Sequence, residues 1–234
     1  MAKQSPPNAI SKDHTEKKSF DYMNPDIPDD LPLFDIPLVK ATPESLQGFG
    51  TVVTDYMSHH VEIVQWPAQG WRKIDDGTGD EAGYLDGIFE FWWEGDVLLG
   101  QNMAVNDCYI LGWSKQPGLA SRGNTAPERS QLLIWHANYH PDGAQLFYPL
   151  DNKPFIAALA KTGDDMKPED WVAFYCDGSF GLCIHPGIWH EAITPLSQKS
   201  RFYDKQGAVH ARVSCDFTKE FGVFLRIPLT QLSE

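Results

Sequence analysis

His136-Ala-Asn138-Tyr-His140-Pro-Asp-Gly143-Ala-Gln145 is one of two stretches around which this 234-residue chain is organised. A second stretch, Gly181-Leu-Cys-Ile-His185-Pro186-Gly187-Ile-Trp189-His190-Glu191, follows it in the C-terminal half. Together they contain four of the eight histidines. Each places histidines among β-branched and aromatic residues around a Pro- and Gly-containing turn, a pattern typical of strand, turn and strand.

Short alternating or apolar runs recur along the rest of the chain, separated by Gly, Pro, Asp and Asn, and they predict β-strands. These runs are 61–66, 87–93, 108–113, 131–136, 145–148, 154–160, 171–175, 181–185, 208–216 and 222–227. Helical signals are confined to 42–48, where Thr42-Pro43-Glu44 is typical of a helix start, and to 167–170. The expected fold class is therefore all-β, a sandwich or barrel with a few short helices.

The composition predicts one β-barrel domain over residues 37–234. Residues 1–36 are poor in hydrophobic residues and rich in Pro, Asp and Lys, which favours a flexible N-terminal extension, or an arm that packs on a neighbour. The net charge of −13 argues against nucleic acid and anionic membranes as partners. With no membrane-spanning apolar run, no secretory signal and no CxxC pair among the four cysteines, we expect a cytoplasmic protein.

The two quoted stretches predict a site that holds a divalent metal ion. Alternate residues of a strand share a face, so Asn138 and His140 lie together, and His136 lies on the same face. Gln145 and His190 each follow a turn that returns the chain toward that face. We expect Asn138, His140, Gln145 and His190 to be the metal ligands, two through imidazole nitrogen and two through amide oxygen. The identity of the ion (Ni, Zn, Mn or Fe) stays open, and purely structural histidines are the alternative.

Four further residues are candidates for catalytic roles. His136 and His185 are candidate general bases, and Glu191 is either a base or the partner that orients a histidine. Arg212 would clamp a substrate carboxylate if its strand face points into the barrel. An exposed Glu191 and a structural ion pair of Arg212 are the alternatives. The acidic run 75–81 is expected to be an exposed loop, because it lacks the spacing of an EF-hand.

The order Asn-x-His-x4-Gln followed by Gly-x-x-His resembles the cupin pattern His-x-His-x4-Glu followed by Gly-x-x-His. More specifically, the sequence resembles the ureidoglycolate lyase family, long called ureidoglycolate hydrolases. The resemblance begins in 38–50, is clearest in 139–149, and recurs in His185-Pro-Gly-Ile-Trp-His190. His140, Gln145, His185 and His190 match family motif residues. Asn138 stands where the family tends to have an acidic residue, Glu191 stands where the family often has His, and 51–130 shows little resemblance.

The resemblance implies a cupin-like double-stranded β-helix, also called a jelly-roll barrel. It implies a carbon–nitrogen lyase that cleaves ureidoglycolate into glyoxylate and urea in allantoin (purine) catabolism. It also implies a divalent ion, a small-molecule carboxylate substrate and a homodimer. Two alternatives stay open: another metal-dependent cupin enzyme, such as a dioxygenase or isomerase acting on a small hydroxy or oxo acid, and a non-catalytic small-molecule-binding cupin.

Overall fold

The computed structural model describes residues 21–64, 70–79, 83–123, 128–208 and 211–229, whose strands form two sheets. The larger sheet has the order β1 (Leu33–Asp35), β17 (Phe224–Pro228), β7 (Gln131–Ile134), β6 (Asp107–Trp113), β5 (Val97–Asn102), β4 (Tyr84–Glu94), β15 (Lys199–Gly207), β9 (Gln145–Pro149), β12 (Gly181–Ile184) and β3 (Gly50–Val53). The smaller has the order β16 (Val213–Asp216), β8 (His136–Tyr139), β13 (Trp189–His190), β10 (Phe155–Ala160), β11 (Val172–Cys176) and β2 (Leu38–Lys40), and β14 (Thr194–Pro195) pairs with β10.

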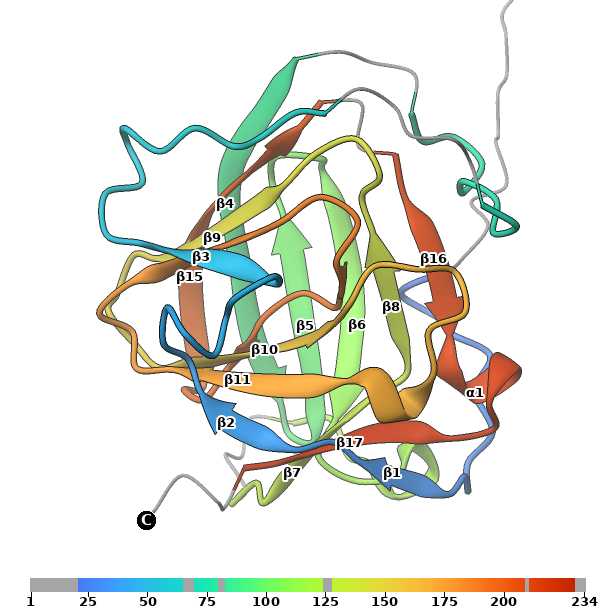
Figure 1. Ribbon diagram of the computed structural model, residues 1–234. Helices are drawn as coiled ribbons and strands as arrows, with labels where there is room; N and C mark the ends of the chain where they lie inside the picture. The colour runs from blue at the N-terminus through green and yellow to red at the C-terminus, as the bar shows by residue number, and fades with distance from the viewer. Residues whose placement is uncertain (1–20, 65–69, 80–82, 124–127, 209–210, 230–234) are drawn as a thin grey trace, which may run out of the picture.

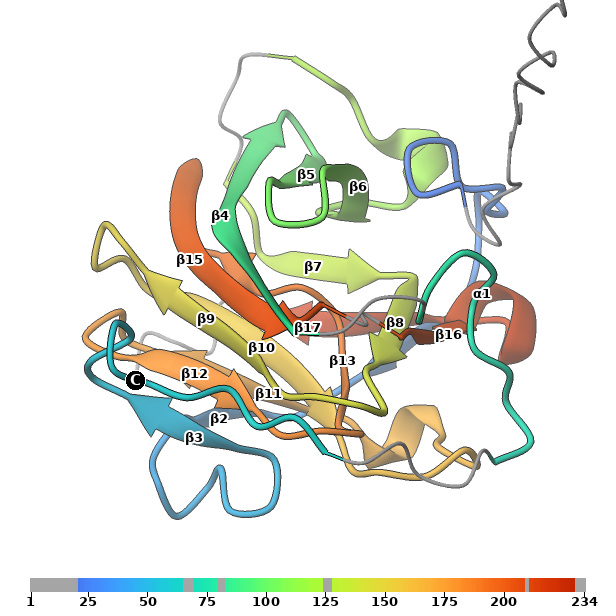
Figure 2. The ribbon, with the colours of Figure 1, turned by 90° about the horizontal axis from the view of Figure 1, so that it is seen from above.

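The two sheets face each other and curve into a barrel, with β10 and β11 across from β5 and β6 (Figures 1 and 2). Helical structure in the described residues is limited to the 3₁₀ turns η1 (Pro117–Leu119) and η2 (Pro168–Asp170) and the short helix α1 (Phe217–Glu220). The predicted all-β, cupin-like fold class is therefore confirmed. None of the helices in the described residues is long and apolar enough to cross a membrane.

The helix that we predicted over 42–48 was wrong, because this segment forms consecutive turns. Gly48 has a φ of 77°, a left-handed conformation that stops helix propagation, and β3 begins at Gly50. The prediction at 167–170 corresponds to η2. The strand predicted over 61–66 was also wrong in its described part, where a single bridge joins Ile63 to Gly143.

Strand β15 was missed by the sequence reading, although it lies between β4 and β9 near the middle of the larger sheet. Its sequence, Lys-Ser-Arg-Phe-Tyr-Asp-Lys-Gln-Gly, looks mostly polar. Phe202, Asp204 and Gln206 alternate along it, and all three side chains are buried. Polar residues therefore occupy part of the inner face of the barrel, so hydrophobic alternation did not reveal the strand.

Aromatic side chains fill the space between the sheets. Phe89 and Phe91 of β4 stack with ring centroids 4.3 Å apart. Phe202 meets Phe91 and Phe155 edge-on, which joins the larger sheet to the smaller one. Phe147 of β9 lies beside Phe89 at 6.3 Å. This aromatic layer supports the polar residues further along the same strands.

Residues 21–36 lie against the barrel. β1 pairs in parallel with β17, and the buried Tyr22 contacts Tyr109 and Trp135. We call residues 21–36 the N-terminal arm. The rest of the extension predicted over 1–36 lies outside the described residues, and the domain boundary at residue 36 stays a prediction.

Replacing Asp96 is expected to destabilise the barrel strongly. Asp96, which is 1% exposed in the turn between β4 and β5, accepts hydrogen bonds from Ser114 Oγ at 2.8 Å and from the N–H and Oγ of Ser121 at 3.1 Å. Asp96→Ala leaves the buried Ser114 hydroxyl without its acceptor and removes both hydrogen bonds from Ser121, so the free energy of unfolding should fall by about 3 kcal/mol. Urea denaturation measures this, with Asp30→Ala at an exposed position as the control.

The same residue predicts the acid limb of stability. Burial alone would raise the pKa of Asp96, but its hydrogen bonds lower that pKa to about 2. Because the folded-state pKa is lower than the unfolded one, this stabilisation is present above about pH 4 and is lost as the pH falls toward 2. The free energy of unfolding should therefore depend on pH more steeply in the wild type than in Asp96→Ala between about pH 4 and pH 2. The same slope in both proteins would contradict the assignment.

Candidate active site

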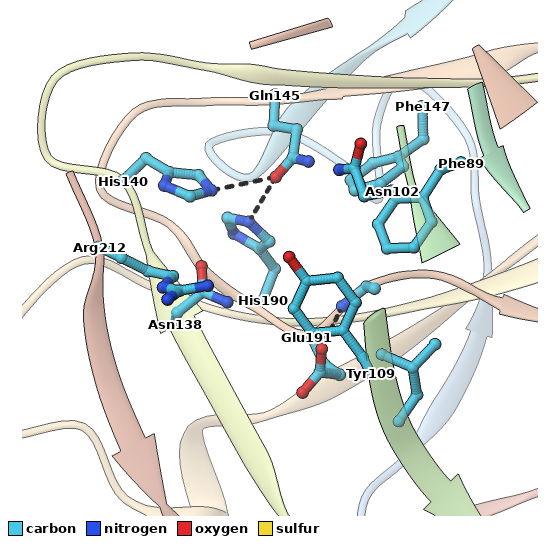
Figure 3. A pocket seen from close by; sticks show the side chains of 12 residues that line it. Phe89, Asn102, Tyr109, Asn138, His140, Gln145, Phe147, His190, Glu191 and Arg212 are labelled. Atoms are coloured by element: carbon cyan, nitrogen blue, oxygen red, sulfur yellow. Dashed lines mark hydrogen bonds between the residues drawn. The ribbon is translucent and has the colours of Figure 1, made fainter. Parts of the chain in front are cut away.

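A pocket opens between the two sheets, with about 370 Å³ of empty volume including its mouth (Figure 3). Both sheets line it, through Phe89, Asn102, Tyr109, Leu111, Asn138, His140, Gln145, Phe147, His190, Glu191, Ala192 and Arg212. Six of the eight candidate residues are therefore together: Asn138, His140, Gln145, His190, Glu191 and Arg212. His136 lies directly behind Glu191, and His185 lies elsewhere.

The two sequence motifs are tied to each other by backbone contacts. His190 on β13 pairs in register with Asn138 on β8. The N–H of Gly187 donates a hydrogen bond to the carbonyl oxygen of His140 at 2.9 Å. Gly187 has a φ of 74°, which favours glycine and explains why a Pro-Gly turn stands before His190. The turns that follow β8 and β12 are thus held side by side.

The protonation of His140 and His190 follows from their partners. His140 Nδ1 lies 2.9 Å from the carbonyl oxygen of Ala211, and His190 Nδ1 lies 2.7 Å from that of Ile188. A carbonyl oxygen only accepts, so each Nδ1 carries a hydrogen and donates it. Burial lowers the pKa of both imidazoles, that of His190 to about 3 with a further contribution from the charge of His140. Both rings are therefore neutral at pH 7, and each Nε2 presents a lone pair.

These two lone pairs face the carbonyl oxygen of Gln145. His140 Nε2 and His190 Nε2 each lie 3.1 Å from Gln145 Oε1 (Figure 3). The orientation of the amide is fixed from behind, because Gln145 Nε2 donates to Asp204 Oδ1 at 2.8 Å. Asn102 Nδ2 donates to the other Asp204 oxygen at 2.9 Å. Three acceptor atoms thus converge with no proton among them.

Converging lone pairs in a buried site suit a cation. The Oδ1 atom of Asn138 is buried and has no hydrogen-bond partner in the described part of the chain, so it adds a fourth acceptor to the pocket. No group of three or more His, Cys, Asp or Glu able to hold a metal is found among the described residues. The available donor set is therefore two imidazoles and two amide oxygens. This set fits a divalent ion, and assigning Asn138, His140, Gln145 and His190 as its ligands remains a proposal.

Asp204 itself is fully buried and unusual in its ionisation. Burial raises its pKa to about 6, although the hydrogen bonds from Gln145 and Asn102 act in the opposite direction. The sequence reading missed both Asp204 and Asn102. A polar residue between Tyr203 and Lys205 gives no sign that it points inward.

Glu191 lines the pocket and is held by two contacts. Its Oε2 lies 3.1 Å from His136 Nδ1, and its Oε1 accepts a hydrogen bond from the N–H of Ala192 at 2.7 Å. Glu191 and His136 are 7% and 2% exposed. His136 therefore positions the carboxylate from outside the pocket, while Glu191 presents it to the pocket (Figure 3).

Arg212 brings a positive charge to the same pocket. Its Nε lies 3.3 Å from Asp75 Oδ2, which also accepts from Ser214 Oγ at 2.5 Å. The N–H of Arg212 donates to Thr78 Oγ1 at 3.2 Å. The terminal Nη atoms of Arg212 make no hydrogen bond with any described residue. The predicted exposure of the acidic loop was wrong at Asp75, which is 8% exposed and orients Arg212.

Two residues change the interpretation taken from the sequence. His185 lies outside the pocket, where its Nε2 is 3.0 Å from Thr51 Oγ1, so its position does not support a general-base role. Tyr109, which the sequence reading missed, points its hydroxyl group into the pocket (Figure 3). Burial raises the pKa of Tyr109, and the hydroxyl keeps its proton at pH 7. Tyr109 lies in the segment that showed little family resemblance.

Comparison with known proteins finds similarity to one family over the part of the chain that contains both motifs. The family model described as ureidoglycolate lyase matches residues 120–218. The ureidoglycolate lyase of Pseudomonas savastanoi pv. phaseolicola is 35% identical over 71 residues, which are 30% of this chain and 42% of the relative. That of Stutzerimonas stutzeri is 33% identical over 79 residues, 33% of this chain and 46% of the relative.

The ureidoglycolate lyase of Azotobacter vinelandii is 35% identical over 79 residues, 33% of this chain and 48% of the relative. In all three comparisons the match spans less than half the length of the curated relative. The matched part includes both motifs and Arg212, whereas Asn102 and Tyr109 come from before it. The predicted resemblance is confirmed: residues 120–218 are similar to the ureidoglycolate lyase family.

Proposed function

We propose that this protein cleaves ureidoglycolate into glyoxylate and urea. The observation that carries the proposal is the pocket in which Arg212 and Glu191 meet the lone pairs of His140, His190 and Gln145. A 2-hydroxy acid presents a carboxylate to Arg212 and a hydroxyl group to Glu191. Its oxygen atoms can also bind a cation held by the lone pairs. The family match over the same residues supports this substrate.

Arg212 binds the substrate carboxylate in this proposal. A guanidinium group whose Nη atoms make no hydrogen bond with the described residues can donate two parallel hydrogen bonds to a carboxylate. Asp75 holds Nε of Arg212, so the side chain is already oriented before the substrate arrives. This fixes the reacting carbon relative to Glu191.

Glu191 is the general base. It takes the proton of the substrate hydroxyl, and the O–H electrons form the new carbonyl bond of glyoxylate as the carbon–nitrogen bond breaks. The electron pair of that bond leaves with the urea nitrogen, to which Glu191 returns the proton. His136 stabilises the carboxylate through Nδ1 and keeps it in the same orientation throughout.

A divalent ion would be held by His140, His190, Gln145 and Asn138, where it would lower the pKa of the substrate hydroxyl as a Lewis acid. A homodimer and a place in allantoin catabolism go with the proposed activity and rest on the family resemblance, whereas the cytoplasmic location rests on the sequence features described above. Neither a dioxygenase or isomerase nor a non-catalytic barrel receives support from the comparisons.

The decisive experiment is to incubate the full chain with ureidoglycolate and measure urea and glyoxylate. We expect the two products in equal amounts. Arg212→Met should raise KM about a hundredfold, because a buried charge-assisted pair with the carboxylate is lost. The KM of Arg212→Lys should lie between those of the wild type and Arg212→Met. Arg201→Met, at an exposed position on β15, is the control.

Release of ammonia in place of urea would contradict the lyase assignment and indicate hydrolysis at the ureido carbonyl. An Arg212→Met variant with an unchanged KM would remove Arg212 from the substrate-binding role. Thermal unfolding of each variant separates these outcomes from loss of the fold.

A further inference from the structure

The N-terminal arm reaches the back of the candidate active site, although it lies far from the part of the chain that matches the family. Tyr22 is 5% exposed, and its carbonyl oxygen accepts a hydrogen bond from the N–H of Ile110 on β6 at 2.9 Å. We propose that the arm is part of the active site and that Tyr22 is a positioning residue for both Arg212 and Glu191. This inference rests on the proposed function, because it takes those two residues as the carboxylate clamp and the base.

The first contact is with Arg212. The guanidinium carbon of Arg212 lies 4.9 Å from the centroid of the Tyr22 ring, within the range of a cation–π contact. Burial raises the pKa of the Tyr22 hydroxyl, so the ring is neutral and meets the charge through its π face rather than as an ion pair. Asp75 holds Nε of the same guanidinium. Tyr22 and Asp75 together restrict where the terminal nitrogens of Arg212 can lie.

The second contact leads to Glu191 through His136. The Tyr22 hydroxyl lies 3.5 Å from His136 Nε2, and the two rings are nearly perpendicular, with an interplanar angle of 83° and centroids 5.0 Å apart. His136 Nδ1 in turn lies 3.1 Å from Glu191 Oε2. Tyr22 therefore fixes the outer edge of the imidazole whose inner edge positions the base.

The arm is anchored well enough to hold Tyr22 in place. The Tyr22 ring meets Tyr109 edge-on at 5.3 Å and lies 6.3 Å from Trp135. Further along the arm, the carbonyl oxygen of Leu31 accepts a hydrogen bond from Gln116 Nε2 at 2.7 Å, and β1 completes the edge of the larger sheet. Both ends of the arm are thus attached to the barrel, which holds Tyr22 beside Arg212 and His136.

The test uses two substitutions that keep an apolar side chain at position 22. Tyr22→Phe keeps the π face and loses the hydroxyl group, whereas Tyr22→Leu loses both. In urea release by the full chain, we expect Tyr22→Leu to raise KM about tenfold through Arg212. Tyr22→Phe should restore KM to within about twofold of the wild type and show only a lower kcat through His136. Tyr84→Leu, on an exposed aromatic of β4, should change neither constant.

A folded Tyr22→Leu variant with wild-type KM, or a KM that Tyr22→Phe does not rescue, would overturn the proposal. Tyr22→Met replaces Tyr22→Leu if the latter does not fold. If the wild type releases no urea, the proposed function fails, and glyoxylate binding measured by calorimetry then decides the role of the arm. Binding weakened about tenfold in Tyr22→Leu and recovered in Tyr22→Phe supports it, and equal binding in all three proteins refutes it.

Discussion

Glu191→Gln lowers kcat for urea release by about a thousandfold and leaves KM within about threefold of the wild type. The amide keeps the size of the side chain and still accepts the hydrogen bond from the N–H of Ala192. It cannot take a proton from the substrate hydroxyl. Binding of the carboxylate by Arg212 is unaffected, so the loss is confined to the chemical step.

Steady-state kinetics of the purified variant measure this, with Glu169→Gln on the exposed turn η2 as the matched control. The control should have wild-type constants. A Glu191→Gln variant that keeps its kcat would transfer the base to another group lining the pocket. A rise in KM alone would make Glu191 a substrate-binding residue instead.

His190→Ala abolishes binding of a divalent ion and lowers kcat by more than about a thousandfold. The substitution removes one of the two imidazoles that approach Gln145 Oε1 at 3.1 Å, and it leaves one imidazole and two amide oxygens as an incomplete donor set. Elemental analysis of protein purified without chelator gives a readout that does not depend on activity. We expect one ion per wild-type chain and none in the variant.

His60→Ala, an exposed histidine, is the control and should keep its ion. An ion retained in full by His190→Ala would place the metal elsewhere. A wild-type protein that releases urea with no ion bound would limit His140 and His190 to hydrogen bonding and orientation of the substrate.

The part of the site that could be predicted from the sequence is the part built by local rules. Strand alternation places Asn138 beside His140, and turns return Gln145 and His190 to the same region. Strand alternation failed for His185, which was predicted to be a general base, because β12 ends at Ile184. The N–H of His185 then donates to the carbonyl oxygen of Phe49, which directs the residue toward β3.

The remaining residues come from long-range packing, which one sequence does not reveal. Asp204 and Asn102 are inward-facing polar residues that stabilise each other and Gln145, and neither follows a hydrophobic pattern. Asp75 looked exposed because its neighbours are acidic, and its partner Arg212 is distant in the sequence. Tyr22 lies in a segment of low hydrophobicity whose contacts are made by the folded barrel. These residues were not predicted because polar side chains on the inner face follow no hydrophobic pattern, and because their partners are distant in the sequence.

The position of β15 between β4 and β9 also governs when the pocket can arise during protein synthesis. β4 and β9 do not pair with each other, and each uses β15 as its neighbour. A nascent chain that has emerged only through residue 198 has Gln145 but lacks Asp204, which fixes the Gln145 amide. Such long-range pairing is slow and leaves strand edges unpaired until it is complete. The pocket is therefore assembled late, and one edge of β4 and one edge of β9 stay unpaired until β15 leaves the ribosome.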